Sequence, residues 1–225
     1  LGAAVYGKAM TGTNAGGWMV LEPWITPSLF YRFLGKTHSE GVGIDQWTFC
    51  ESLGPEEGNR VLRSHWDNWY TEEMFAEMAE RELEIIRLPI GDWTLRQYGP
   101  YIGCTDGAED KVEWFLDMAE KYGIKVLLDV HGVKDSQNGY DNSGKATIVD
   151  WEDETHFKHW HHSIGEWMGP YNRLTHSYKY INEENMQWAL DTVDLLLEKW
   201  GDHPAMYALE PVNEPWFNSD MNRLK

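Results

Sequence analysis

In residues 112–130, with the sequence VEWFLDMAEKYGIKVLLDV, the spacing of the apolar residues changes at Gly123. In the first half Val112, Phe115, Leu116 and Ala119 recur at the spacing of one helix face. Gly123 favours a helix end, and residues 124–130 form a short, nearly all-apolar run. The stretch therefore predicts a helix followed by a buried strand, which is typical of parallel sheets.

Two further stretches repeat this pattern. Thr71 can cap a helix that leads into a strand at 85–90, and a third helix from near Asn182 to Gly201 precedes a strand around 207–212. A less clear first strand precedes Asn14. Alternating helices and apolar strands predict an α/β fold with a parallel sheet, either doubly wound or a (β/α)8 TIM barrel.

Polar residues after each strand decide between these two folds. They are Asn14 and Glu22, then Asp92 and Trp93, then residues 131–142, then Asn213 and Glu214. A barrel draws its site from several strand ends, whereas no phosphate-binding glycine motif supports a nucleotide fold. Four strands make half a barrel, so we expect residues 1–225 to be the N-terminal half of a catalytic barrel with a loop insertion at about 132–181.

Thirty-seven acidic and nineteen basic side chains give a formal net charge of -18. This charge disfavours nucleic acid and anionic lipid as partners, and a neutral substrate fits better. No apolar run is long enough to span a membrane, and the first ten residues lack the features of a signal peptide, so we expect any export signal to have been removed.

Thirteen tryptophans are the compositional anomaly. Most are expected in the core, but several stand in stretches that we interpret as polar loops: Trp47, Trp66, Trp69, Trp151, Trp160 and Trp216. Because sugar rings stack on indole rings, this surplus points to carbohydrate. Cys50 and Cys104 could form a disulfide or remain two buried thiols, and their spacing does not decide between these.

Glu214 follows Asn213 at a strand end and precedes Pro215, which stops the hydrogen-bond ladder. Glycoside hydrolysis needs one carboxylic acid and usually a second carboxylate, so Glu214 is a candidate acid. Glu210 points to the same side but lies about 13 Å away along a strand, whereas retaining enzymes need about 5 to 5.5 Å. We therefore interpret Glu210 as structural.

Arg87 stands inside an apolar strand, where it must meet a carboxylate or line a pocket. His131 ends its strand and could orient an acid or a sugar hydroxyl. The histidine-rich run 156–162 could suggest a metal, but we favour a solvated helix and expect no metal site and no cofactor.

Taken together, these stretches resemble glycoside hydrolase family 5, and within it the exo-β-1,3-glucanase branch. The matching stretches are NAGGWMVLEPWITPSLF (14–30), HWDNWYTEEMF (65–75), RLPIGDWTL (87–95), GIKVLLDVHGVKDSQNGYDNSG (123–144) and LEPVNEP (209–215). They are spread over most of the chain, in the family's order. The resemblance implies the (β/α)8 barrel.

The resemblance also implies roles for individual residues. Glu214 would be the acid/base, Asn213 would bind the sugar beside it, Arg87 would support the nucleophile and His131 would shape the same subsite. Positions that match hydroxyl-binding or pocket-entrance residues are Glu22, Asp141, Asn142 and Tyr140. The family's nucleophile is a glutamate on a later strand, which these residues do not include, and the insertion is longer than usual for the branch.

We therefore expect a secreted or cell-wall retaining hydrolase that acts on β-1,3-glucan as a monomer. Three alternatives stay open. The same mechanism could cleave β-1,4-glucan or mannan, it could transfer the glycosyl unit to another sugar, or the protein could be a non-catalytic carbohydrate-binding relative.

Overall fold

The computed structural model describes residues 9–146, 149–159, 165–172, 174–216, 219–220 and 222. The α-helices within this part are α1 (Pro27–Phe30), α2 (Gln46–Trp69), α3 (Glu72–Glu80), α4 (Ala108–Lys121) and α5 (Glu183–Trp200). The 3₁₀ helices are η1 (Tyr31–Phe33), η2 (His38–Glu40), η3 (Asp92–Thr94), η4 (Gly99–Tyr101) and η5 (Asp141–Ser143). The strands are β1 (Gly12–Asn14), β2 (Ile85–Gly91), β3 (Lys125–Gly132), β4 (Val149–Trp151), β5 (Phe157–His159), β6 (Tyr171–Asn172), β7 (Ser177–Tyr178) and β8 (Met206–Glu210).

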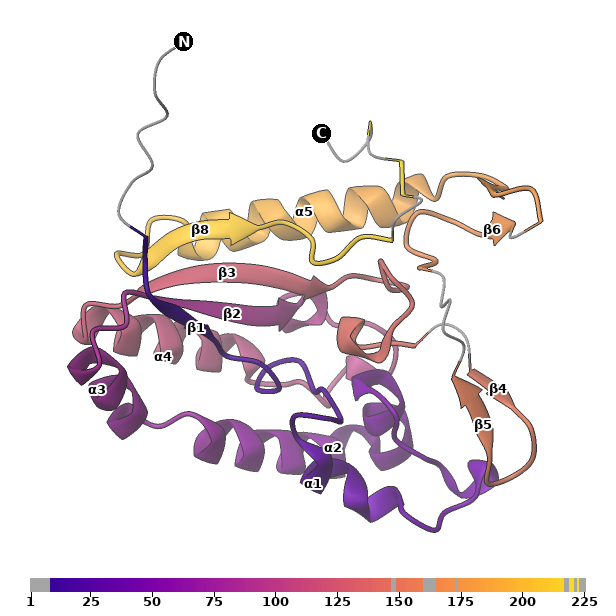
Figure 1. The fold of residues 1–225 in the computed structure, drawn as a ribbon. Helices are drawn as coiled ribbons and strands as arrows, with labels where there is room; N and C mark the ends of the chain where they lie inside the picture. The colour runs from indigo at the N-terminus through magenta and orange to yellow at the C-terminus, as the bar shows by residue number, and fades with distance from the viewer. Residues whose placement is uncertain are drawn as a thin grey trace.

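The central sheet has the order β1-β2-β3-β8, and each neighbouring pair is parallel. Helices α3, α4 and α5 each precede one of its strands, which confirms the three helix-then-strand units and the parallel sheet predicted from the sequence. The loops after β2, β3 and β8 leave the sheet on one side, where the strand arrows point in Figure 1. Parallel order thus brings together residues from distant parts of the chain.

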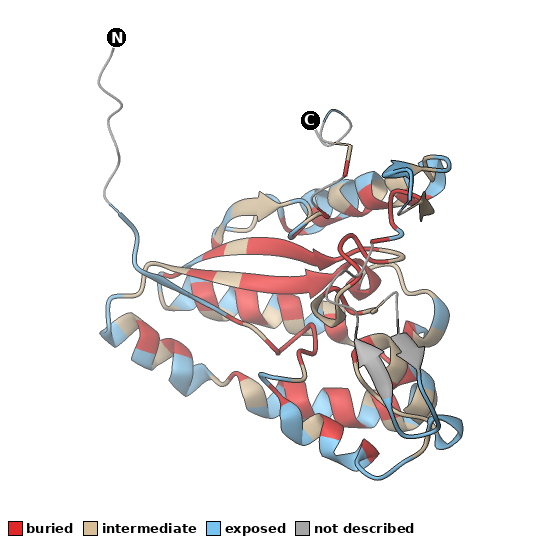
Figure 2. Ribbon diagram, turned by 45° about the vertical axis from the view of Figure 1, so that its right-hand side comes forward, coloured by how far each residue is buried: buried red, intermediate tan, exposed pale blue. Residues whose placement is uncertain are grey.

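The core lies between this sheet and the helices, and β2 and β3 are its most buried strands (Figure 2). Helix α4 places Phe115 at the centre of an aromatic cluster, with its ring 4.8 Å from that of Phe75 on α3. The rings of Trp18 and Tyr70 lie 5.1 and 5.5 Å from Phe115. Such tilted and edge-on contacts stabilise the packing beyond the area that they bury.

Helix α2 corrects the sequence interpretation of three tryptophans. Trp47, Trp66 and Trp69 lie on this helix and not in loops, and Trp66 is fully buried. The helix kinks at Gly54, which has φ +72°, just before Pro55. This interruption, followed by a glycine at 58, obscured the helical period in the sequence.

The predicted insertion contains two hairpins, in which β4 pairs with β5 and β6 pairs with β7, all antiparallel. The expected solvated helix in the histidine-rich run is therefore wrong for residues 157–159, which form β5. Trp151 lies in β4, whereas Trp160 and residues 161–164 lie outside the described residues. The helical spacing of the histidines predicted a helix, but pairing with β4 gives residues 157–159 the conformation of a strand.

Cys50 and Cys104 are joined in a disulfide with a Cα–Cα distance of 5.9 Å, which decides between the two alternatives. The bond ties α2 to the segment before α4. None of the helices in the described part of the chain combines the length and the apolar character that a membrane span requires.

Candidate active site

Arg87 forms the centre of a hydrogen-bond network at the strand ends. Its Nη2 lies 2.9 Å from a carboxylate oxygen of Glu210 and 3.0 Å from one of Asp129, and its Nε donates to the same Glu210 oxygen at 2.9 Å. Nη2 also donates to Oδ1 of Asn213 at 2.9 Å. The prediction that Arg87 meets a carboxylate is confirmed, and its partners come from β3, β8 and the turn after β8.

Asp129 connects this network to His131. Its Oδ2 lies 2.6 Å from Nδ1 of His131, both residues being on β3. An ionised Asp129 accepts the Nδ1–H and so fixes the ring tautomer. The other ring nitrogen then faces Glu22, whose Oε1 lies 3.7 Å away. Glu22, from the segment after β1, thus lies beside His131.

Glu214 stands at the edge of this network with an exposed side chain. Its Oε2 accepts a hydrogen bond from Nδ2 of Asn142 at 3.1 Å. Its φ of +43° is uncommon for a residue with a Cβ, and such a conformation persists where the surrounding structure determines it. Asn142 is one of the predicted hydroxyl-binding residues, so the structure brings these two predictions together.

The loop after β3 carries the remaining predicted residues. The Tyr140 ring lies 6.0 Å from the ring of Trp216, which follows the Glu214 turn and is buried. Asp141 is close enough to Glu22 for its charge to raise the pKa of the Glu22 carboxyl. The loop itself is tightly packed, because Ser136 Oγ lies 2.5 Å from Ser143 Oγ.

Burial changes the ionisation of the network. It raises the pKa of Glu22 and of Asp129, although His131 opposes the rise in both. For Arg87 burial acts to lower the pKa, but the hydrogen bond with Glu210 and the Asp129 charge outweigh it and hold the pKa above its usual value. The arrangement keeps Arg87 charged, with acceptors of two strands fixed around it.

Sequence reasoning missed some residues of the network and gave others no definite place. Glu210 was interpreted as structural, and its ion pair with Arg87 agrees with that interpretation. Asp129, the second carboxylate partner of Arg87, had been given no role from the sequence. Asn14 contributes a longer contact, with Oδ1 3.5 Å from Arg87 Nη1. Asp92, by contrast, is buried outside it and accepts hydrogen bonds from Tyr98, Lys134 and Trp188.

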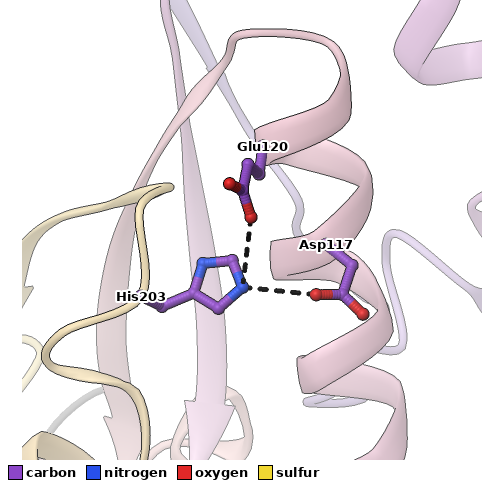
Figure 3. A group of neighbouring side chains, drawn as sticks. All are labelled: Asp117, Glu120 and His203. Atoms are coloured by element: carbon purple, nitrogen blue, oxygen red, sulfur yellow. Dashed lines mark hydrogen bonds and ion pairs between the residues drawn. The ribbon is translucent and has the colours of Figure 1, made fainter.

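One group of possible metal ligands occurs among the described residues, and it lies before the strands rather than after them. Asp117 and Glu120 on α4 point toward His203, whose Nε2 is 3.3 Å from Asp117 and 3.9 Å from Glu120 (Figure 3). The main-chain N–H of Ala205 donates to Nδ1 of His203, so a neutral ring carries its proton on Nε2. A metal at Nε2 needs the opposite tautomer, so we interpret the group as a hydrogen-bond link, in which Nε2 of His203 donates to Asp117 on α4.

The sequence matches a family model described as cellulase, glycosyl hydrolase family 5, over residues 54–222. It is 36% identical over 221 residues to the sporulation-specific glucan 1,3-beta-glucosidase of Saccharomyces cerevisiae, covering 95% of this chain and 43% of that protein. A probable glucan 1,3-beta-glucosidase A of Aspergillus niger is 41% identical over 211 residues, covering 92% of this chain and 41% of that protein.

Solved structures agree at the level of the fold. The crystal structure of a rutinosidase from Aspergillus niger superposes with a TM-score of 0.64 at 19% sequence identity, covering 94% of this chain and 51% of that one. The chain spans less than half the length of the curated relatives named above. A family model that matches most of the chain, with relatives above 30% identity over nearly all of it, shows that the chain belongs to glycoside hydrolase family 5.

Proposed function

We propose that the chain forms the first half of the (β/α)8 catalytic barrel of a retaining hydrolase that cleaves β-1,3-linked glucan. Glu214 is the acid/base in this proposal, and the nucleophile is a glutamate on a later strand of the complete protein. The names of the curated relatives, glucan 1,3-beta-glucosidases, support the substrate class.

The observation that carries the proposal is the position of Glu214. Its carboxylate stands in the turn after β8, next to Asn213, and Asn213 is bound to the Arg87 network. A carboxylic acid at this place can protonate the oxygen of the departing sugar while the nucleophile attacks the anomeric carbon. The same carboxylate then takes a proton from the water that releases the glycosyl unit.

The surrounding side chains suit a neutral, hydroxyl-rich substrate. Amide groups of Asn142 and Asn213, the His131 ring and the Glu22 and Asp141 carboxyls offer both donors and acceptors, and Tyr140 adds an aromatic face. Buried Nδ2 of Asn213 has no partner within the described structure, which suits a donor reserved for a sugar hydroxyl. Arg87 holds Asn213 directly and His131 through Asp129.

The open sheet supports the half-barrel assignment. Strands β1 and β8 are its two edges, and an unpaired edge strand beside apolar surface promotes aggregation. Tyr207 of β8 is 58% exposed, and Leu190 and Leu197 of α5 are 58 and 46% exposed. Further strands and helices of a barrel would cover both features.

An extracellular or cell-wall location is part of the proposal. Disulfides persist mainly in oxidising compartments, and the Cys50–Cys104 bond suits one. The bulk of a polymeric β-glucan also requires an enzyme that reaches it outside the cell.

The test is hydrolysis of laminarin by the complete protein and by its Glu214→Gln variant. Loss of the acid/base should lower turnover by about 10²- to 10⁴-fold. Glu198→Gln is the matched control, because Glu198 is exposed near the C-terminal end of α5, which leads to the start of β8 and lies at the other end of the sheet from the Glu214 turn. Unchanged turnover by Glu214→Gln would refute the assignment of Glu214 as the acid/base. Greater activity of the wild type on cellulose oligomers or mannan than on laminarin would refute β-1,3-glucan as the substrate.

A further inference from the structure

Gln137 joins the two strand ends that carry the proposed sugar-binding residues, and the proposed function gives it no role. The side chain is 1% exposed. Its Nε2 donates to the main-chain oxygen of His131 at 2.8 Å and to that of Asn213 at 2.9 Å. Its Oε1 accepts from the main-chain N–H of Val133 at 3.2 Å. Both amide hydrogens and the oxygen are thus engaged.

The main chain of Gln137 holds the same turn a second time. Its carbonyl oxygen accepts from the N–H of Trp216 at 3.0 Å. The turn from Asn213 to Trp216 is therefore fastened by Gln137 on both sides of Glu214. A further bond runs from the Asn213 N–H to the Val130 oxygen at 2.9 Å.

Glu214 depends on this support more than a residue within a strand would. Its backbone is in the left-handed region, with φ +43°, and its exposed side chain has the Asn142 bond as its described direct hydrogen bond. The direction of the carboxyl is consequently set by the backbone of the turn. A shift of about 1 Å at a reacting group can cost about 100-fold in rate.

We propose that Gln137 is a positioning residue that aims the Glu214 carboxyl at the glycosidic oxygen. It acts by holding the carbonyls of His131 and Asn213, and it does not touch the substrate. This inference rests on the proposed function, because it assigns Glu214 as the acid.

The chemistry separates a positioning role from a general structural one. A glucoside of an alcohol needs its leaving oxygen protonated, whereas 2,4-dinitrophenolate leaves from its glucoside without a proton. The ratio kcat/KM reports the steps up to departure of the leaving group when that step is irreversible. A misdirected Glu214 therefore lowers kcat/KM for the first substrate and spares the second, while a damaged binding site lowers both.

The experiment compares the complete wild-type protein with Gln137→Met, a variant of similar shape that removes both donors. We expect kcat/KM to fall about 10- to 100-fold for laminaribiose and less than about 3-fold for 2,4-dinitrophenyl β-glucoside. Azide should restore kcat on the aryl glucoside, because it attacks the glycosyl-enzyme without help from a base. Gln137→Glu, which keeps one donor when protonated, should be intermediate, and it replaces the Met variant if that one does not fold.

Asn185→Leu is the matched control. Asn185 is also a buried amide that holds this loop, through its 3.0 Å bond to Asp135, but it does not contact the Glu214 turn. It should lower stability and leave the ratio of the two kcat/KM values unchanged. Equal losses on both substrates, or none, in both Gln137 variants would overturn the inference. A wild-type protein inactive on every β-glucoside would instead refute the proposed function.

Discussion

Arg87 is surrounded by carboxylates, and its planar guanidinium matches this surrounding. Two of its nitrogens bond Glu210, and one of these also reaches Asp129, whose side chain is fully buried. A lysine in its place would be a point charge without the fixed fork of donors. The network therefore depends on this residue type and not on positive charge alone.

Replacement of Arg87 by methionine should destabilise the protein. It would leave the Asp129 carboxylate with His131 as its described partner in a site without water access, and separating a buried ion pair costs about 3 to 5 kcal/mol. Because the Arg87 side chain is 26% exposed, we expect a loss of about 2 to 3 kcal/mol in the free energy of unfolding. Urea denaturation measures this loss.

Arg60→Met is the control for that measurement. Arg60 also pairs with a glutamate, Glu57, but its side chain is 67% exposed on α2. Exposed pairs contribute little, so the urea midpoint should stay where it is in the wild type. If the Arg87 variant is as stable as this control, Arg87 does not stabilise the protein through its buried ion pairs.

At the scale of elements, α2 is fastened to the rest of the molecule by its disulfide. Cys50 lies before the kink of α2, and Cys104 lies in the segment that leads into α4. A Cβ on Gly58 would stand 2.6 Å from Sγ of Cys104, so the bond packs directly against the helix backbone. The disulfide therefore needs a glycine at position 58, although a glycine in the middle of a helix destabilises the helix.

Removing the disulfide by the double substitution Cys50→Ala and Cys104→Ala should lower the free energy of unfolding by about 4 kcal/mol. The estimate follows from the sequence separation of 54 between the two cysteines, because the bond restricts the unfolded chain. Thermal denaturation of the variant, with the reduced wild type as a second comparison, measures the effect. Equal melting temperatures of variant and oxidised wild type would show that the bond contributes nothing.

At the scale of the molecule, the parallel sheet was predictable because its helices and strands have strong hydrophobic periods. Helix α4 with β3, and α5 with β8, follow the sequence closely. Helix α2 was missed because Gly54 and Pro55 break its pattern. The two insertion hairpins were missed because pairing between short strands leaves little trace in one sequence.

The candidate site was predictable to the same extent. Strand ends located Glu214, Asn213, His131 and Glu22, and Arg87 was conspicuous as a charge inside a strand. The register of parallel strands then decides which of these side chains meet, and sequence spacing does not contain it. Gln137 gave no signal at all, since an amide in a loop is unremarkable until its partners are known.

Two buried aspartates give the whole molecule a dependence on pH. Burial raises the pKa of Asp92 to about 7 and that of Asp45 to about 6. Asp92 links the end of β2 to the loop after β3 and to α5, through Tyr98, Lys134 and Trp188. Asp45 caps α2 and accepts from the N–H of Ala146 at 2.7 Å.

The sign of the effect follows from proton uptake. An aspartate of the unfolded chain titrates near pH 4, so between about pH 4 and 7 the native protein holds protons at these two sites that the unfolded chain releases. Their contribution to stability is fully present below pH 4 and is lost as the pH rises through 6 and 7. Other groups act in the opposite direction, since burial lowers the pKa of His65.

A comparison with Asp92→Asn isolates one of these sites. The amide cannot titrate, so the free energy of unfolding of the wild type, minus that of the variant, should rise as the pH falls from 8 to 5. The rise approaches about 1.4 kcal/mol per pH unit for one proton. Asp194→Asn, at an exposed position of α5, is the control, and its difference from the wild type should stay constant. A constant difference for Asp92→Asn as well would mean that Asp92 stays ionised in the native protein, held by its three donors against the cost of burial.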